Sequence, residues 1–169
     1  SGYHVQGSDI NKSSNTDRLE KLGIKVYIGQ KKINVNNAKI IVISTAISET
    51  NEEYIAAKKM FLPIVHRSEM LGELMRLKQS IAIAGTHGKT TTTSLIAKMV
   101  EENGMDPTII NGGIISSLNS NARLGNGEWM VVEADESDGS FTKLNPTAAI
   151  ITNIDLEHLD YHKTEGNLE

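Results

Sequence analysis

The sequence lacks cysteine and is poor in proline and aromatic residues, with 3 prolines and 4% aromatics among 169 residues. The absence of cysteine excludes disulfides, thiolate zinc sites and cysteine nucleophiles, and it favours a cytoplasmic location. A net charge of −4 gives no basic footprint for nucleic acid. No apolar run approaches the length of a membrane span, and no basic start leads into an apolar stretch as in a signal peptide. We therefore expect neither nucleic acid nor a membrane as a partner.

The pattern along the chain predicts an α/β fold. With 38% hydrophobic and 22% charged residues, the composition is that of a globular protein with one full domain or parts of two. Short apolar runs alternate with stretches of helical periodicity, which indicates mostly parallel sheets. The predicted strands are 4–8, 24–27, 39–44, 63–65, 80–84, 108–110, 129–132 and 148–152. The predicted helices are 16–22, capped by Asn15 or Thr16 and stopped by Gly23; 51–60; one capped by Ser68 that carries Met70, Leu71, Leu74 and Leu77; and 94–103.

The segment Ala84–Thr93 follows an apolar strand and opens a helix, the arrangement that cradles a nucleotide triphosphate. Lys89 can supply positive charge to the β/γ phosphates, and Thr90 can offer a hydroxyl to Mg²⁺. The loop is shorter than the general P-loop, because Ile83 stands where that pattern has a glycine. The alternative is a plain glycine turn with an exposed lysine. The candidate nucleotide-binding residues are Gly85, Thr86, His87, Gly88, Lys89, Thr90 and Thr91.

An acidic cluster, Glu133–Asp138, follows the apolar strand 129–132. An acid at the end of such a strand is where nucleotide enzymes of this class hold Mg²⁺. Glu133 is the best ligand candidate because it lies nearest the strand. The alternative is a solvated acidic turn.

A third cluster, Thr152–Asp160, also follows an apolar strand. Because successive strand ends of an open parallel sheet meet in one crevice, this cluster is expected near the phosphate loop and Glu133. Taken alone, His158 is more often an exposed or capped histidine than a ligand, and Mg²⁺ prefers oxygen.

Five segments together resemble the Mur ligases, ATP-dependent amide-forming enzymes of peptidoglycan precursor synthesis. They are Ala84–Thr93, Asn111–Gly113, Asn121–Gly125, Glu133–Asp138 and Thr152–Asp160. Within the family the combination is most similar to the member that joins L-alanine to UDP-N-acetylmuramate. The nearest alternative is the muropeptide-recycling member, which joins a tripeptide to the same nucleotide sugar, and Ser137 favours the former. A truncated, non-catalytic nucleotide-binding module and an unrelated P-loop ATPase are further alternatives.

The resemblance implies a truncated Rossmann-like UDP-binding domain in residues 1–66, then part of a P-loop-type parallel-sheet ATP-binding domain in residues 67–169. ATP and Mg²⁺ would be the cofactors, and UDP-N-acetylmuramate and L-alanine the substrates. The implied roles are Lys89 on the β/γ phosphates, Thr90 and Glu133 on one Mg²⁺, His158 on a second Mg²⁺ near the reacting carboxylate, Asn111 and the turn 135–137 beside the nucleotide or muramate, and Asp9 and Ser44 on the UDP part.

The resemblance also predicts that the chain is a fragment. Ser1 falls just after the place of the family's glycine-rich loop for the UDP diphosphate, and Glu169 falls inside the central domain. We therefore expect this chain to be inactive alone.

Overall fold

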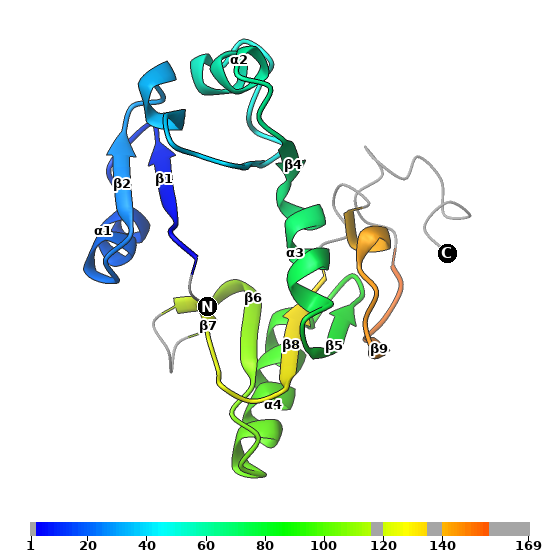
Figure 1. The fold of residues 1–169 in the computed structure, drawn as a ribbon. Helices are drawn as coiled ribbons and strands as arrows, with labels where there is room; N and C mark the ends of the chain where they lie inside the picture. The colour runs from blue at the N-terminus through cyan, green and yellow to red at the C-terminus, as the bar shows by residue number, and fades with distance from the viewer. Residues whose placement is uncertain (1–2, 116–119, 135–139, 156–169) are drawn as a thin grey trace. The chain divides into compact units, whose positions relative to one another are not determined.

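The computed structural model describes residues 3–115, 120–134 and 140–155 (Figure 1). The chain folds as two compact units, Ser1–Arg67 and Ser68–Glu169. Both units alternate helices with parallel strands, which confirms the predicted α/β class. The assignment of UDP to residues 1–66 and of ATP to residues 67–169 stays a prediction.

The first unit contains two parallel strand pairs, each joined through a helix. One is β1 (Gln6–Asp9), α1 (Ser14–Lys21) and β2 (Lys25–Ile28); the other is β3 (Ile41–Ile43), α2 (Glu52–Lys59) and β4 (Ile64–His66). The pairs form separate two-stranded sheets, and the short helix η1 (Lys32–Val35) packs on α2. Asp9 therefore ends a strand of one sheet, and Ser44 directly follows a strand of the other.

Helix α1 begins earlier than predicted, because its cap is Ser13 rather than Asn15 or Thr16. The Thr16 amide donates to Ser13 Oγ at 3.3 Å, and the Ser13 amide donates to Thr16 Oγ1 at 2.8 Å. This reciprocal pair satisfies two amides that the helix itself leaves unpaired. Gly23 stops the helix as predicted, with a φ of +82° that glycine adopts without strain.

A polar cluster joins three elements of the first unit. Glu53 of α2 accepts hydrogen bonds from Ser8 Oγ at 2.6 Å and from Asn34 Nδ2 at 2.7 Å. Asn34 is buried, so its amide needs such a partner. The carboxylate therefore ties α2 to β1 and η1.

The second unit is built on one five-stranded sheet in the order β7-β6-β8-β5-β9. Strands β6, β8, β5 and β9 are parallel, and β7 is antiparallel to β6. The elements of this unit are α3 (Arg67–Met75), β5 (Gln79–Ala84), α4 (Lys89–Glu102), β6 (Thr108–Ile115), β7 (Ser120–Arg123), β8 (Trp129–Glu133), η2 (Ser140–Lys143) and β9 (Ala148–Ile151). The antiparallel β7 was not predicted from the sequence.

A helix covers each face of this sheet, as the near-continuous apolar strands require. Ala97 of α4 packs with Ile83 and Val131 in one buried cluster. Met75 of α3 packs with Ala82 and Val132 in the other. Alternate residues of β5 and β8 thus face opposite helices, and the sheet is held as the middle layer.

Two predictions for the helices of this unit were wrong. Helix α4 begins at Lys89 rather than Ser94, so Thr90 lies in its first turn. Ser68 lies inside α3 rather than capping it, and Leu77 falls beyond the helix with 71% of its surface exposed. Met75, two residues earlier along the chain, lies in the core instead. None of the helices in the described ranges could cross a lipid bilayer, being too short or too polar.

Candidate nucleotide-binding site

Strand register brings the described parts of the three predicted clusters to one edge of the sheet. Ile83 lies opposite Glu133, Ala84 lies opposite Ile151, and Ile110 lies opposite Val132. The loop after β5, the end of β8, the middle of β6 and the segment after β9 therefore meet at the carboxyl ends of the parallel strands. This edge is where open α/β sheets bind ligands.

The loop 85–88 turns sharply between β5 and α4. Gly85 has a φ of +123° and Gly88 a φ of +80°, a backbone region that favours glycine. Gly88 is the N-cap of α4 and supplies no side-chain cap, so the helix end is not closed by its own residues. A helix N-terminus that follows a glycine loop suits an anion.

Lys89 lies in this turn, half-buried. Its ammonium donates to the carbonyl oxygens of Gly85 at 2.6 Å and Thr86 at 3.0 Å. These contacts hold the positive charge over the loop, where the phosphates of a nucleotide would lie.

Thr90 and Glu133 contact each other directly. The Thr90 hydroxyl lies 3.0 Å and 3.1 Å from the two carboxylate oxygens of Glu133. Glu133 also accepts from the Gly112 amide at 2.8 Å, and a Cβ at Gly112 would lie 2.9 Å from a Glu133 oxygen. Glycine at 112 therefore allows the carboxylate to approach β6, an arrangement the sequence did not reveal.

Asn111 lies beside this pair and is buried, with 3% of its surface exposed. Its amide nitrogen donates to Ser94 Oγ at 3.2 Å and approaches the Thr90 carbonyl at 3.5 Å. Its oxygen Oδ1 is buried and has no hydrogen-bond partner among the described residues. A buried acceptor normally has a hydrogen-bond partner, so this oxygen is available to bind a ligand or an ion.

These donors fit magnesium. Mg²⁺ prefers hard oxygen ligands and commonly takes one or two protein groups, with phosphates and water completing its shell. Thr90 Oγ1 and the Glu133 carboxylate are such groups, and the unpaired Asn111 Oδ1 adds a third oxygen nearby. No cluster of three or more histidine or acidic side chains occurs in the described part of the chain, so the arrangement does not suit a dedicated protein cage.

The segment after β9 holds the phosphate loop from one side. The Thr86 amide donates to the Asn153 carbonyl at 3.1 Å, and Thr86 Oγ1 accepts from the Asp155 amide at 2.9 Å. Thr86 is buried as a result. The His87 ring is exposed and lies 4.0 Å from the Asp155 carboxylate.

The remaining predicted residues have simpler surroundings. Thr91 is exposed in the first turn of α4. Asp9 Oδ1 accepts from the Asn11 amide at 3.3 Å, and Ser44 is half-buried. His158 and the turn 135–137 lie outside the described residues, so their predicted roles stay predictions.

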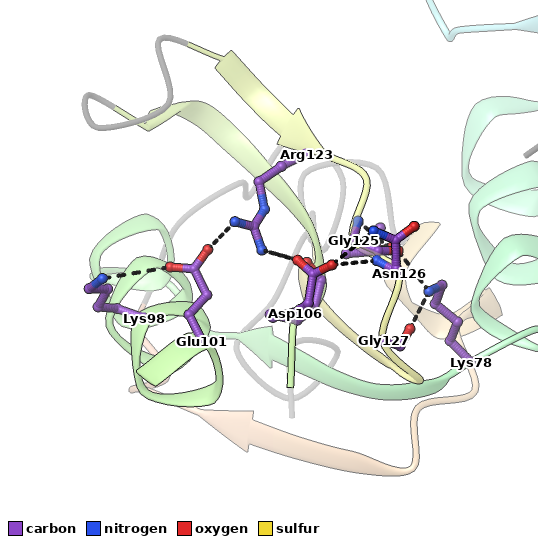
Figure 2. Close-up of polar contacts among 10 residues, drawn as sticks. Lys78, Lys98, Glu101, Asp106, Arg123, Gly125, Asn126 and Gly127 are labelled. Atoms are coloured by element: carbon purple, nitrogen blue, oxygen red, sulfur yellow. Dashed lines mark hydrogen bonds and ion pairs between the residues drawn. The ribbon is translucent and has the colours of Figure 1, made fainter. Parts of the chain in front are cut away.

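A second polar cluster lies at the opposite end of α4 (Figure 2). Arg123 of β7 forms an ion pair with Glu101 of α4, and it donates to Asp106 Oδ1 and to the Pro107 carbonyl, each at 3.1 Å. Asp106 also accepts from the Asn126 amide at 2.8 Å, and this backbone hydrogen bond is the main reason that its pKa is lowered. The cluster ties the end of α4 and the start of β6 to β7.

Comparison with protein families gives two matches that together span almost the whole chain. Residues 1–79 match the Mur ligase family, catalytic domain, and residues 83–169 match the Mur ligase middle domain. The chain belongs to the Mur ligase family. The resemblance inferred from the phosphate loop and the two later clusters is therefore confirmed.

Curated relatives of this Mur ligase chain include UDP-N-acetylmuramate--L-alanine ligases. The UDP-N-acetylmuramate--L-alanine ligase of Parvibaculum lavamentivorans is 63% identical over 161 residues, which is 95% of this chain and 33% of that protein. The ligase of the same name from Rhodospirillum rubrum is 59% identical over 163 residues, which is 96% of this chain and 34% of that protein. The chain thus spans about a third of the length of the relatives it matches.

Solved Mur ligase structures share the fold. The UDP-N-acetylmuramate-alanine ligase of Thermotoga maritima has a TM-score of 0.88 and 31% identity over 97% of this chain and 39% of its own. A UDP-N-acetylmuramate:L-alanyl-gamma-D-glutamyl-meso-diaminopimelate ligase from Neisseria meningitides has a TM-score of 0.87 and 28% identity over 99% of this chain and 58% of its own. Fold similarity alone therefore does not separate the two kinds of ligase.

Proposed function

We propose that this chain is part of an ATP-dependent ligase that joins L-alanine to UDP-N-acetylmuramate. The observation that carries the proposal is the contact of Thr90 with Glu133 at the N-terminus of α4, beside a glycine loop and its lysine. These groups are of the kind that bind a metal ion and phosphates. The substrates are inferred from the names of the relatives, because the residues of this site would fit any nucleoside triphosphate.

The proposed chemistry joins a carboxylate to an amine through an acyl phosphate. ATP would give its γ-phosphoryl group to the lactyl carboxylate of UDP-N-acetylmuramate, and the amine of L-alanine would then attack the acyl carbon and expel phosphate. Mg²⁺, when bound, would neutralise charge on the phosphates. No covalent bond to the enzyme is needed.

The described residues would bind and orient the phosphates. Lys89 would leave the loop carbonyls and place its charge on the β/γ phosphates, where negative charge builds up during transfer. Thr90 and Glu133 would hold Mg²⁺, and Asn111 would contact the same end of the nucleotide through Oδ1. The loop residues Gly85, Thr86, His87, Gly88 and Thr91 would surround the phosphates.

Three further assignments rest on the family resemblance. His158 would help to hold a second Mg²⁺ near the reacting carboxylate. Asp9 and Ser44, at the ends of β1 and β3, would contact the UDP part of the substrate. The cytoplasmic location expected from the sequence stays a prediction.

The second candidate is the ligase that transfers a tripeptide to the same nucleotide sugar. It is favoured by the fold similarity to the Neisseria structure, at 28% identity. The 63% identity to an alanine ligase outweighs that similarity.

The test is phosphate release by the full-length protein with ATP, Mg²⁺ and UDP-N-acetylmuramate. We expect release to depend on L-alanine and not on the tripeptide, and to disappear in Lys89→Ala. Release that requires the tripeptide would favour the second candidate, and release without either amine would contradict both.

A further inference from the structure

The side chain of Asn153 contacts the His87 peptide groups from both sides. Its oxygen Oδ1 accepts from the His87 amide at 2.9 Å, and its nitrogen Nδ2 donates to the His87 carbonyl at 3.0 Å. The Thr152 hydroxyl donates to the same carbonyl at 2.7 Å. Residues 66 positions apart in the sequence thus fix both peptide groups of one loop residue.

Other contacts show that the whole loop packs against the segment that follows β9. The Thr152 amide donates to the Ala84 carbonyl at 3.0 Å, which continues the β5–β9 pairing one step beyond β9. A Cβ at Gly85 would lie 2.8 Å from the Asn153 carbonyl oxygen, closer than real Cβ contacts. The loop and the segment 152–155 therefore pack directly, with glycine leaving room for the contact.

We propose that Asn153 is a positioning residue that sets the shape of the phosphate loop before the nucleotide binds. Because Asn153 Oδ1 accepts a hydrogen bond from the His87 amide, that amide points toward Asn153. The amides that follow it, at the start of α4, are then the ones that face the phosphates. A loop held in its bound shape loses less conformational freedom on binding, which raises affinity. Asn153 itself need not touch the nucleotide.

An asparagine suits this task better than related residues. An aspartate keeps the acceptor for the His87 amide but sets a negative oxygen against the His87 carbonyl. An alanine removes both hydrogen bonds. At about 0.7 kcal/mol for each hydrogen bond, near the lower end of the usual net range, loss of the pair corresponds to roughly tenfold.

The first test is amide hydrogen exchange of His87 in the nucleotide-free protein, which needs no ligand. We expect slow exchange in the wild type and in Asn153→Asp, and fast exchange in Asn153→Ala. Fast exchange in the wild type would overturn the inference. Thr152→Val, which keeps the shape and the Asn153 contacts, should leave the His87 amide protected.

The second test measures the affinity of the full-length protein for MgATP by calorimetry, and it rests on the proposed function. We expect Asn153→Ala to weaken MgATP binding about tenfold, while UDP-N-acetylmuramate binding stays as in the wild type. The matched control is Asn103→Ala, which removes one exposed amide-to-carbonyl bond to Met99 at the far end of α4.

The outcomes separate the two claims. Unchanged MgATP affinity in a folded Asn153→Ala protein overturns the positioning role and leaves the proposed function standing. A wild type that binds no MgATP overturns both. Equal loss of MgATP and UDP-sugar binding would show general unfolding and overturn the positioning role as well.

Discussion

Arg123 and Asp106 form an ion pair with 3.1 Å between Nη2 and Oδ1, which anchors β7 to the turn before β6. The same guanidinium pairs with Glu101 at the end of α4 (Figure 2). Its Nε is buried without a partner among the described residues, so the side chain uses its two terminal nitrogens. Arginine thus joins three elements through one planar group.

We predict that Arg123→Ala destabilises the second unit by about 1–2 kcal/mol, because it removes the ion pairs with Glu101 and Asp106 and the hydrogen bond to the Pro107 carbonyl. The Glu101 side chain is 23% exposed, so water can partly solvate its carboxylate after the arginine is removed, which limits the loss of stability. The control is Arg76→Ala, whose pair with Glu73 is nearly two-thirds exposed on both sides and should contribute under about 0.5 kcal/mol. Urea unfolding measures both, and equal losses would contradict the prediction.

The lowered pKa of Asp106 predicts a pH dependence. The Asn126 amide is the main cause, and Arg123 adds a smaller attraction. Because the folded-state pKa lies below the unfolded value, this stabilisation is fully present above the ordinary carboxyl range. It is lost as pH falls below about 4 through the folded pKa.

The comparison of wild type with Asp106→Asn over pH 7 to 3 tests this dependence. The difference in unfolding temperature should stay constant above about pH 5 and shrink below about pH 4. A difference that does not change with pH would show that the charge of Asp106 is not involved.

Lys89→Ala in the full-length protein should nearly abolish amide formation and leave UDP-N-acetylmuramate binding largely intact. The ammonium lies over the phosphate loop in the second unit, while the proposed uridine site lies in the first. The control is Lys98→Ala, an exposed lysine of α4 paired with Glu102 at 2.6 Å. Near-normal turnover in the Lys89 variant would disprove its role.

Glu133→Gln should weaken the Mg²⁺-dependent part of ATP binding, because a neutral amide lacks the charge that a hard cation favours. The exposed Glu102→Gln serves as control, since Glu102 pairs only with Lys98 among the described residues. Calorimetry with and without Mg²⁺ measures the difference. If Glu102→Gln weakened binding more than Glu133→Gln, the choice of ligand would be wrong.

Sequence patterns predicted the strands better than the helix ends. The apolar runs that became β5 and β8 are unambiguous because a helix covers each face of the sheet at these strands. The first turn of α4 was missed because it contains the run Thr90–Thr93, and threonine has a low helix propensity. The geometry of the preceding loop sets the start of the helix instead. Strand β7 (Ser120–Arg123) has no apolar alternation and is fixed by pairing with β6.

The candidate site was predictable only in part. The strand ends placed Lys89, Thr90 and Glu133 together, because parallel strands end at one edge. The Gly112 amide on Glu133 and the Asn153 contacts with His87 join residues 21 and 66 positions apart. No local pattern encodes such contacts, since they depend on strand order and register.

Gly85 and Gly88 should respond differently to alanine, although both have a positive φ. At Gly88 a Cβ would meet nothing within 4 Å, so Gly88→Ala pays only backbone strain, about 1–2 kcal/mol. At Gly85 a Cβ would collide with the Thr152 side chain and with Asn153, whose backbone nitrogen would lie 3.0 Å away. Gly85→Ala should therefore also push the segment 152–155 off the loop.

This contrast gives the most direct check of how the loop is held. Gly85→Ala should expose the His87 amide to hydrogen exchange and lower MgATP affinity by more than tenfold. The reason is that it adds backbone strain to the loss of hydrogen bonds that contribute roughly 1 kcal/mol each. Gly88→Ala should keep the His87 amide protected, because Asn153 still reaches it. Protection lost equally in both variants would mean that backbone strain, rather than the contact with 152–155, controls the loop.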